Sequence, residues 1–238
     1  MVKSIGPDVS RTLNDPEKKC KILRTLAEWG HADAAVNLGI LLINGSDAEC
    51  KEGIQWIRKA AEAGNGSGMR NLGYCYAIGK GTERDSKNAA YWYRRSAEAG
   101  NIRAMCNLGV LYEFGNGVEQ DYEEAAYWYR KSAEGNNSRA QTNLAYLLSK
   151  GLGVKKNIHE AVMLYTKSGT PRAAYNLAMM MIGESELDRD PEMVENLLKY
   201  ASDKGYAKAT VALTEILGDS EKLKNSVEKQ DLKATKML

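Results

Sequence analysis

The sequence predicts an all-α solenoid, a row of two-helix units copied along the chain, and three observations carry this prediction. Tryptophans recur 36 residues apart, at Trp56, Trp92 and Trp128. The segment 89–101, AAYWYRRSAEAGN, returns almost unchanged as 125–137, AAYWYRKSAEGNN. A triplet Asn-Leu-Gly or Asn-Leu-Ala begins at positions 37, 71, 107, 143 and 176. Self-similarity with a period of about 20–50 residues is typical of solenoids and arrays.

The clearest copy, residues 102–137, contains two helices. Ala104, Leu108 and Tyr112 recur every four residues and form one face of a first helix. The sequence Gly-Asn-Gly at 115–117 ends this helix, because glycine accepts the backbone conformations of a helix end and a turn. Asp121, followed by Glu124, resembles a capping box that opens a second helix.

The same pattern divides the chain into repeats of one domain, residues 1–238. Gly-x-Gly turns at 79–81 and 151–153, with Asp85 and Asn157 as the next helix starts, repeat the pattern in the neighbouring copies. We expect an N-terminal cap at 1–30 and repeats at 31–65, 66–101, 102–137, 138–170 and 171–206. Residues 207–238 are then a degenerate repeat and a C-terminal cap, since the end of a solenoid must present a polar face.

Small and aromatic residues at fixed repeat positions have a predicted packing role. Gly73, Gly109 and Ala145 lie where the two helices of a repeat should cross, and only a side chain of at most one methyl permits a close approach. Large aromatic residues should fill the space between successive helix pairs. These aromatic residues are Tyr76, Trp92, Tyr112 and Trp128.

Composition excludes several function classes. The 238 residues include 33 Lys and Arg against 31 Asp and Glu, so the net charge of +2 lacks the positive surplus of a nucleic-acid-binding protein. No stretch approaches the roughly 18 apolar residues of a membrane span. The opening MVKSIGPDVSRTLNDPEKK has no apolar core of a signal peptide. We therefore expect a cytoplasmic protein without a membrane span.

Residues suited to catalysis or metal binding are few. His31 and His159 are the only histidines, and neither has another metal ligand at a suitable spacing. Four cysteines without a C-x-x-C pair, Cys20, Cys50, Cys75 and Cys106, are expected to be reduced and mostly buried, with pairing of Cys75 and Cys106 as the alternative. The sequence has no H-E-x-x-H, no G-x-S-x-G and no phosphate-loop pattern, and a Ser-x-x-Lys at Ser226 to Lys229 lacks its partner motifs and is interpreted as a chance match. The sequence predicts no enzyme, no metal and no cofactor.

The run from Ala104 to Ala133 resembles a known repeat. It reads A-x-x-x-L-G-x-x-Y-x-x-G-x-G-V-x-x-D-x-x-x-A-x-x-W-Y-x-x-S-A and is similar to the Sel-1-like repeat, a relative of the tetratricopeptide repeat. The resemblance is strong over 67–137, good over 31–66 and 138–178, and weak beyond. It implies a right-handed superhelix of antiparallel helix pairs that acts as an adaptor or scaffold, for example in signalling.

In tetratricopeptide-like stacks the first helix of each repeat lines the concave surface, and this likeness suggests a binding groove. With the repeated leucine as the seventh position, we expect the fifth and ninth positions to face the groove. The fifth positions are Val36, Arg70, Cys106, Thr142 and Tyr175; the ninth are Ile40, Tyr74, Val110, Tyr146 and Met179. Tyrosine and arginine are enriched among binding anchors, so this surface suits a peptide. Packing of these side chains against neighbouring repeats is the alternative.

An asparagine precedes the leucine in each repeat. These residues are Asn37, Asn71, Asn107, Asn143 and Asn176. A carboxamide could bind a peptide backbone, since it offers both a donor and an acceptor. It could equally bond to the neighbouring helix pair, and the structural role is favoured. The predicted partner-binding residues are therefore Arg70, Asn71, Tyr74, Asn107, Val110, Asn143, Tyr146 and Tyr175.

Three functions remain open from the sequence. The favoured one is a monomeric, non-enzymatic adaptor that binds a protein or peptide partner in the groove. The second is a binder of small molecules or cell-wall fragments, since a cysteine-rich secreted branch of the family binds or hydrolyses β-lactams; the paired cysteines of that branch are absent here. The third is a self-associating array that uses the cluster Met179, Met180 and Met181 as its contact surface.

Overall fold

The computed structural model describes residues 15–184, 187, 190–216 and 218, and its secondary structure in this part of the chain is helical, without strands. The chain divides into two compact units, Met1–Gly135 and Asn136–Leu238. The first unit contains α2 (Pro16–Glu28), α3 (Ala32–Leu42), α4 (Asp47–Glu62), α5 (Gly66–Ile78), α6 (Ser86–Glu98), α7 (Ile102–Phe114) and α8 (Tyr122–Glu134). The second contains α9 (Ser138–Lys150), α10 (Ile158–Ser168), α11 (Pro171–Gly183), α12 (Pro191–Asp203) and a helical segment at 207–216. The predicted all-α repeat fold is confirmed.

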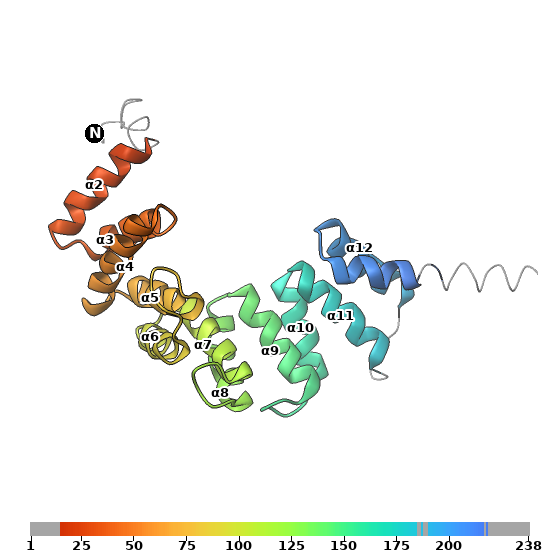
Figure 1. Ribbon diagram of the computed structural model, residues 1–238. Coiled ribbons are helices and arrows are strands. Elements are labelled where there is room, and N and C mark those ends of the chain that lie inside the picture. Colours follow the sequence, from red (N-terminus) through yellow and green to blue (C-terminus); the bar gives the residue numbers. More distant parts are fainter. Residues whose placement is uncertain (1–14, 185–186, 188–189, 217, 219–238) are drawn as a thin grey trace, which may run out of the picture. The chain divides into compact units, whose positions relative to one another are not determined.

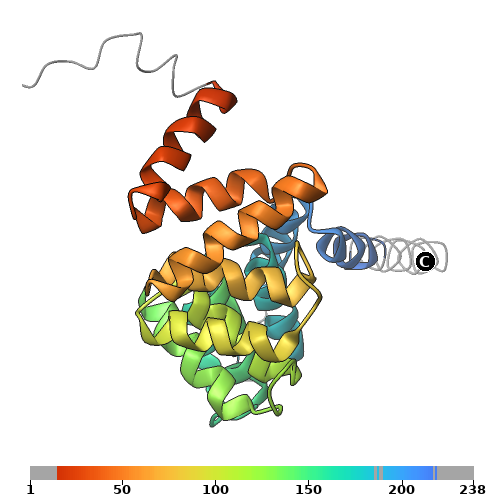
Figure 2. The same cartoon turned by 60° about the vertical axis from the view of Figure 1, so that its left-hand side comes forward.

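Helices of the first unit pack as successive pairs. Helix α3 packs on α4, α5 on α6, and α7 on α8, and each pair contacts the next through α4 with α5 and through α6 with α7 (Figure 1). Figure 2 shows the orange and yellow helices of residues 32–98 lying against one another. Helices α3 and α5 are also in contact, so the first helices of these two repeats form a shared surface.

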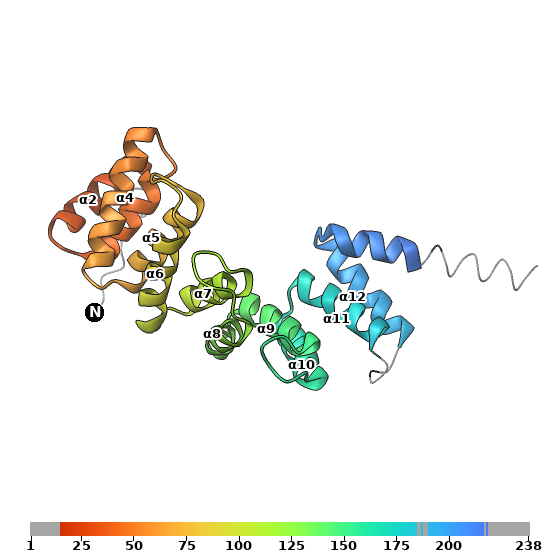
Figure 3. The same ribbon diagram turned by 60° about the horizontal axis from the view of Figure 1, so that its bottom comes forward.

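The second unit repeats this arrangement with α9 on α10 and α11 on α12 (Figures 1 and 3). The pairs meet through α10 and α11, and the first helices α9 and α11 also touch. Each unit therefore has one layer of first helices and one layer of second helices.

Helix starts lie at the residues that the sequence predicts. Asp85, Asp121 and Asn157 are the N-caps of α6, α8 and α10, and each side chain accepts a backbone N–H of the first turn. The carboxylate of Glu124 accepts the indole N–H of Trp128 at 3.0 Å. The reciprocal capping box expected there is instead found at the start of α4, between Ser46 and Glu49.

Glycine permits both the turns and the helix crossings. Gly79, Gly115 and Gly151 end α5, α7 and α9 with φ of 73°, 67° and 69°, a conformation that other residues rarely adopt. A Cβ at Gly109 would lie 2.7 Å from the Tyr129 ring, and one at Gly73 would lie 2.8 Å from the Tyr93 ring. The predicted close approach of the two helices is confirmed at both sites.

The core of each repeat is built from the repeated leucine and from aromatic residues of the second helix. Leu38, Leu72, Leu108 and Leu144 are almost completely buried. Trp92 packs with Ile54, Ile57, Leu72 and Cys75, so it joins the α3–α4 pair to the α5–α6 pair as expected. Burial of such a side chain stabilises the fold by about 2–3 kcal/mol.

In each of three helix pairs, a buried serine of the second helix forms a hydrogen bond to the first helix. The Oγ atoms of Ser96, Ser132 and Ser168 donate to the carbonyl oxygen of the first residue of the preceding helix. These acceptors are the carbonyls of Gly66, Ile102 and Ser138, at 2.6, 2.7 and 2.9 Å. The bond satisfies a buried hydroxyl and fixes where the second helix ends against the first.

At the N-terminal end, α2 packs on α3, as a cap would, with Ala27 buried and Ile22 exposed. The predicted C-terminal capping helix in 219–238 lies outside the described residues.

Candidate functional site

The first helices expose the ninth repeat position and bury most of the fifth. Ile40, Tyr74, Tyr146 and Met179 are exposed, and Val110 is half-buried. At the fifth position Val36, Cys106 and Thr142 are buried, so the expectation that these three face a groove is wrong. Val36 packs in a buried cluster with Ala27 of α2 and Ala60 of α4, and the hydroxyl of Thr142 lies 2.7 Å from Oγ of Ser168 at the end of α10. The longer Arg70 and Tyr175 stay half-buried.

A pocket of about 270 Å³ opens between α3 and α5 in the first unit. Two predicted site residues, Asn71 and Tyr74, line it together with apolar side chains from α3, α4 and α5 and from the C-cap of α3, and with Asn44 and Lys80 from the turns after α3 and α5. The apolar lining residues are Ile40, Ile43, Ile57, Cys75 and Ile78. A pocket lined mainly by apolar groups with a few polar atoms is the usual form of a binding site. This pocket is our candidate site.

Arg70 adds charge next to this pocket. Its guanidinium donates to Oδ1 of Asn71 at 2.8 Å, and Nδ2 of Asn71 donates to the carbonyl oxygen of Ser67 at 2.9 Å. Burial lowers the pKa of Arg70, and the positive charge of Arg103 lowers it further. Arginine still remains protonated at neutral pH. Arg70 therefore places a positive charge next to Asn71, a residue of the apolar pocket.

The other predicted site residues lie elsewhere. Asn107 and Val110 are half-buried on α7 and do not line this pocket. Asn143, Tyr146 and Tyr175 belong to the second unit. The carboxamide oxygen of Asn143 accepts a hydrogen bond from Arg172 of the neighbouring helix pair. Asn143 thus bonds to the neighbouring helix pair, as its structural role predicts, whereas both partners of Asn71 lie within α5 itself.

The remaining candidate groups have structural surroundings. Within the described residues no group of three or more potential metal ligands comes together. His31 is the N-cap of α3, and His159 is exposed on α10. All four cysteines are described; Cys50, Cys75 and Cys106 are buried and none forms a disulfide. Burial raises the pKa of Cys75 to about 12, so its thiol is not ionised at neutral pH.

Of the three methionines proposed as a contact surface, only Met179 is exposed. Met180 and Met181 are buried inside the second unit, so the expectation of a methionine surface is wrong for both. Among the helices that the structure describes, none has the length and apolar character needed to cross a membrane.

Comparison with known families agrees with the repeat geometry. The Sel1 repeat matches residues 32–65, 66–101, 102–137, 138–170 and 171–206. The chain belongs to the Sel1 repeat family. Sel1 repeat proteins generally mediate protein–protein interactions.

Solved structures of Sel1 repeat proteins resemble the chain. A protective antigen of uropathogenic Escherichia coli is 32% identical with a TM-score of 0.76, over 85% of this chain and 44% of the antigen's own length. A Sel1 repeat protein from Oxalobacter formigenes is 28% identical with a TM-score of 0.66, over 83% of this chain and 88% of that protein. The chain thus spans less than half of the first relative. No curated protein matches the chain in sequence.

Proposed function

We propose that this Sel1 repeat protein is a non-enzymatic adaptor that binds a polypeptide partner on the surface of its first helices. The observation that carries the proposal is the apolar pocket between α3 and α5, with Tyr74 at its edge. Tyr74 is 48% exposed, so a large aromatic ring is available to a partner. Tyrosine presents much contact area for little loss of conformational entropy.

The pocket is suited to an apolar side chain of an extended or helical peptide. Ile40 and Ile78 are also exposed, so three large apolar side chains from two helices surround one opening. A contiguous apolar patch on a water-exposed helix surface is a common mark of a protein-binding site. Lys80 and Arg70 next to it favour a partner with acidic residues beside its apolar anchor.

The proposed binding residues are those of the first helices. They are Arg70, Asn71, Tyr74, Asn107 and Val110 in the first unit and Asn143, Tyr146 and Tyr175 in the second. Tyr74 is proposed as the anchor, whereas Asn71 and Asn143 are proposed to act by positioning Arg70 and Arg172, from which they accept hydrogen bonds. We propose that the protein acts as a cytoplasmic monomer and uses no cofactor.

Selection of displayed peptides tests this proposal. Peptides enriched on the wild-type protein should bind Y74A at least about tenfold more weakly, because a central aromatic anchor contributes 2 kcal/mol or more. The matched control is Y127A, which removes a tyrosine of the same 48% exposure from α8, in the second-helix layer of the same unit. It should bind like the wild type.

Two results would contradict the proposal. One is that no peptide is enriched on the wild-type protein. The other is that the enriched peptides bind Y74A and Y127A with equal affinity, in which case the anchor lies elsewhere.

A further inference from the structure

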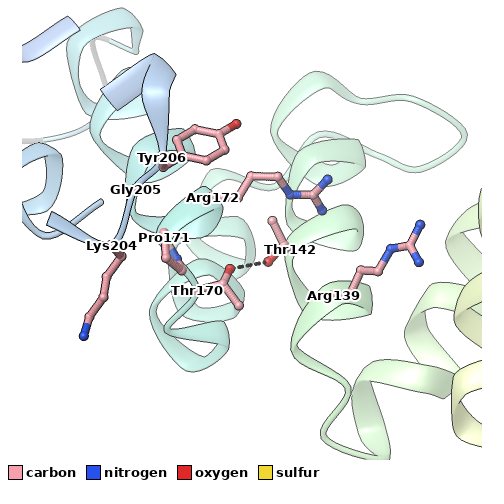
Figure 4. A pocket seen from close by; sticks show the side chains of 8 residues that line it. All are labelled: Arg139, Thr142, Thr170, Pro171, Arg172, Lys204, Gly205 and Tyr206. Atoms are coloured by element: carbon pink, nitrogen blue, oxygen red, sulfur yellow. Dashed lines mark hydrogen bonds between the residues drawn. The ribbon is translucent and has the colours of Figure 1, made fainter. Parts of the chain in front are cut away.

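A second pocket, of about 410 Å³, lies entirely within the second unit and is not part of the predicted site. Helices α9 and α11 contribute their first turns to it, and the turn after α12 closes one side (Figure 4). Its polar lining residues are Arg139, Thr142, Thr170, Arg172, Lys204 and Tyr206. Its volume lies in the range of pockets that bind small molecules or side chains.

The pocket concentrates positive charge without an acidic partner. Arg139, Arg172 and Lys204 line it, and the lining includes no aspartate or glutamate. Within the described part of the chain, neither arginine forms an ion pair, and the hydrogen-bond partner of Arg172 is the uncharged Asn143. Figure 4 shows both guanidiniums on the α9 side of the opening, whereas the Lys204 side chain extends away from them. The two arginines therefore define the site.

Buried hydrogen bonds hold the walls of this pocket in place. Thr142 is 1% exposed, and its hydroxyl lies 2.9 Å from the carbonyl oxygen of Ser138, 2.7 Å from Oγ of Ser168 and 3.3 Å from Oγ1 of Thr170. This network joins the start of α9 to the end of α10 and to the N-cap of α11. A site fixed before binding loses less conformational entropy when it is occupied.

Two further contacts position the groups that a ligand would meet. The hydrogen bond to Asn143, itself a buried residue, restrains the guanidinium of Arg172, which extends from α11 toward α9 (Figure 4). The rings of Tyr206 and Tyr175 pack with centroids 5.3 Å apart, so the aromatic wall is also supported. Arg172 and Tyr206 thus combine a cation and an apolar surface in one pocket.

We propose that this pocket binds the carboxylates of an acidic peptide segment. The planar guanidinium forms two parallel hydrogen bonds to a carboxylate, and two guanidiniums suit two acidic groups. The pocket is larger than one small oxyanion needs, and Pro171 with Tyr206 offers apolar contact to the aliphatic part of the ligand. This inference rests on the proposed adaptor function in one respect, that the ligand is a polypeptide.

The two arginines of the pocket occupy the same position in successive repeats, and this position is not basic in every repeat. The second residue of the matched repeats is Asp33, Ser67, Arg103, Arg139 and Arg172 in chain order. Only the last two line the pocket, where successive repeats place them on neighbouring first helices.

Fluorescence anisotropy with defined peptides tests the inference. The probe is a fluorescein-labelled octapeptide with two adjacent glutamates flanked by leucines, and its counterpart carries two glutamines. The wild-type protein should bind the glutamate peptide at least about tenfold more tightly than the glutamine peptide, as charged hydrogen bonds contribute that much or more. The R139Q/R172Q variant should lose this preference.

The matched control is K150A/K167A, which removes two exposed positive charges from the same unit at positions outside the pocket. Its affinity should stay within about twofold of the wild type, because exposed charges contribute little at distant sites. Thermal unfolding of both double variants shows whether they are folded. Should R139Q/R172Q fail to fold, R139Q alone, which leaves the Arg172–Asn143 bond intact, takes its place.

Three results would overturn the inference. In the first, both peptides bind equally. In the second, the control loses as much affinity as the arginine variant. In the third, inorganic phosphate protects the protein against thermal unfolding while the glutamate peptide does not, which would assign the pocket to a small oxyanion. Y74A should keep the glutamate preference, so failure here is distinguishable from failure of the α3–α5 site.

Discussion

Both compact units are built from the same type of helix pair, but different side chains pack inside and between the pairs. In the first unit, glycine lies at the helix crossing, as at Gly109, and Trp92 packs between two helix pairs. In the second, alanine occupies the crossing at Ala145, and Leu197 stands at the tryptophan position of the last matched repeat. Three hydroxyl groups form a buried network at 142, 168 and 170.

The pockets of the two units also differ in the chemistry of their lining residues. The pocket between α3 and α5 is mainly apolar, whereas the pocket at the start of α9 and α11 is cationic. Both form where first helices of successive repeats touch. The repeated residues thus specify the fold, while the variable residues of the first helices set the chemistry of each pocket.

The largest expected difference between the units concerns the tryptophan position. W128A should lower the free energy of unfolding by about 3–5 kcal/mol, since Trp128 is almost fully buried and a large cavity would remain. L197A should cost only about 1–2 kcal/mol, because Leu197 is half-buried. Urea unfolding followed by circular dichroism measures both. Equal losses would show that the last repeat contributes as much to the core as the third.

The helix crossing provides a second, smaller test. G109A should destabilise the protein by about 1–3 kcal/mol, because the added methyl would lie 2.7 Å from the buried Tyr129 ring. A145G should cost about 1–2 kcal/mol, through a lost buried methyl and a more flexible unfolded chain. Thermal unfolding of the two variants gives the comparison. A stabilising G109A would mean that the helices of that pair are not in close contact.

The smallest effect concerns the helix caps and acid pH. The pKa of Asp85 lies below its ordinary value, mainly because the backbone N–H of Asn88 donates a hydrogen bond to its carboxylate. The ionised carboxylate therefore stabilises the fold above the ordinary pKa, and this contribution is lost as the pH falls through the lowered pKa. Asn157 caps α10 without titrating in this range.

D85N should accordingly show a shallower fall of the melting temperature below about pH 4 than the wild type. N157D, the reverse exchange, should show a steeper fall, because it introduces a titrating cap. Melting temperatures measured between neutral and acid pH decide this. Identical pH profiles for the wild type and both variants would mean that neither cap carboxylate is linked to folding.

Much of the fold could be predicted from particular residues. Asp85, Asp121 and Asn157 marked helix starts because capping depends on a few neighbouring backbone groups. Gly109 marked a helix crossing, since its recurrence within a helix needed a steric reason. The buried serines were missed, although Ser96, Ser132 and Ser168 recur every 36 residues and that spacing was a usable signal.

The candidate site was predicted less completely. Tyr74 and Asn71 were expected on the first-helix surface and share one pocket there. Val36 and Thr142 were expected to face the groove and are buried, because periodicity within one helix does not show how closely the neighbouring helices pack. Arg139 and Arg172 carried no signal of their own, since an arginine at a helix start is ordinary on any surface.

By itself, the sequence determined the helix pairs, their boundaries and the buried leucine of each repeat, because these depend on residues within a few positions of one another. Only the tertiary structure decided which side chains stay accessible and which distant residues share a pocket. Arg139 and Arg172 lie 33 residues apart, and Ile40 and Tyr74 lie 34 apart. Their pockets exist because packing one repeat on the next buries apolar surface, and the details of that packing set what remains open to a partner.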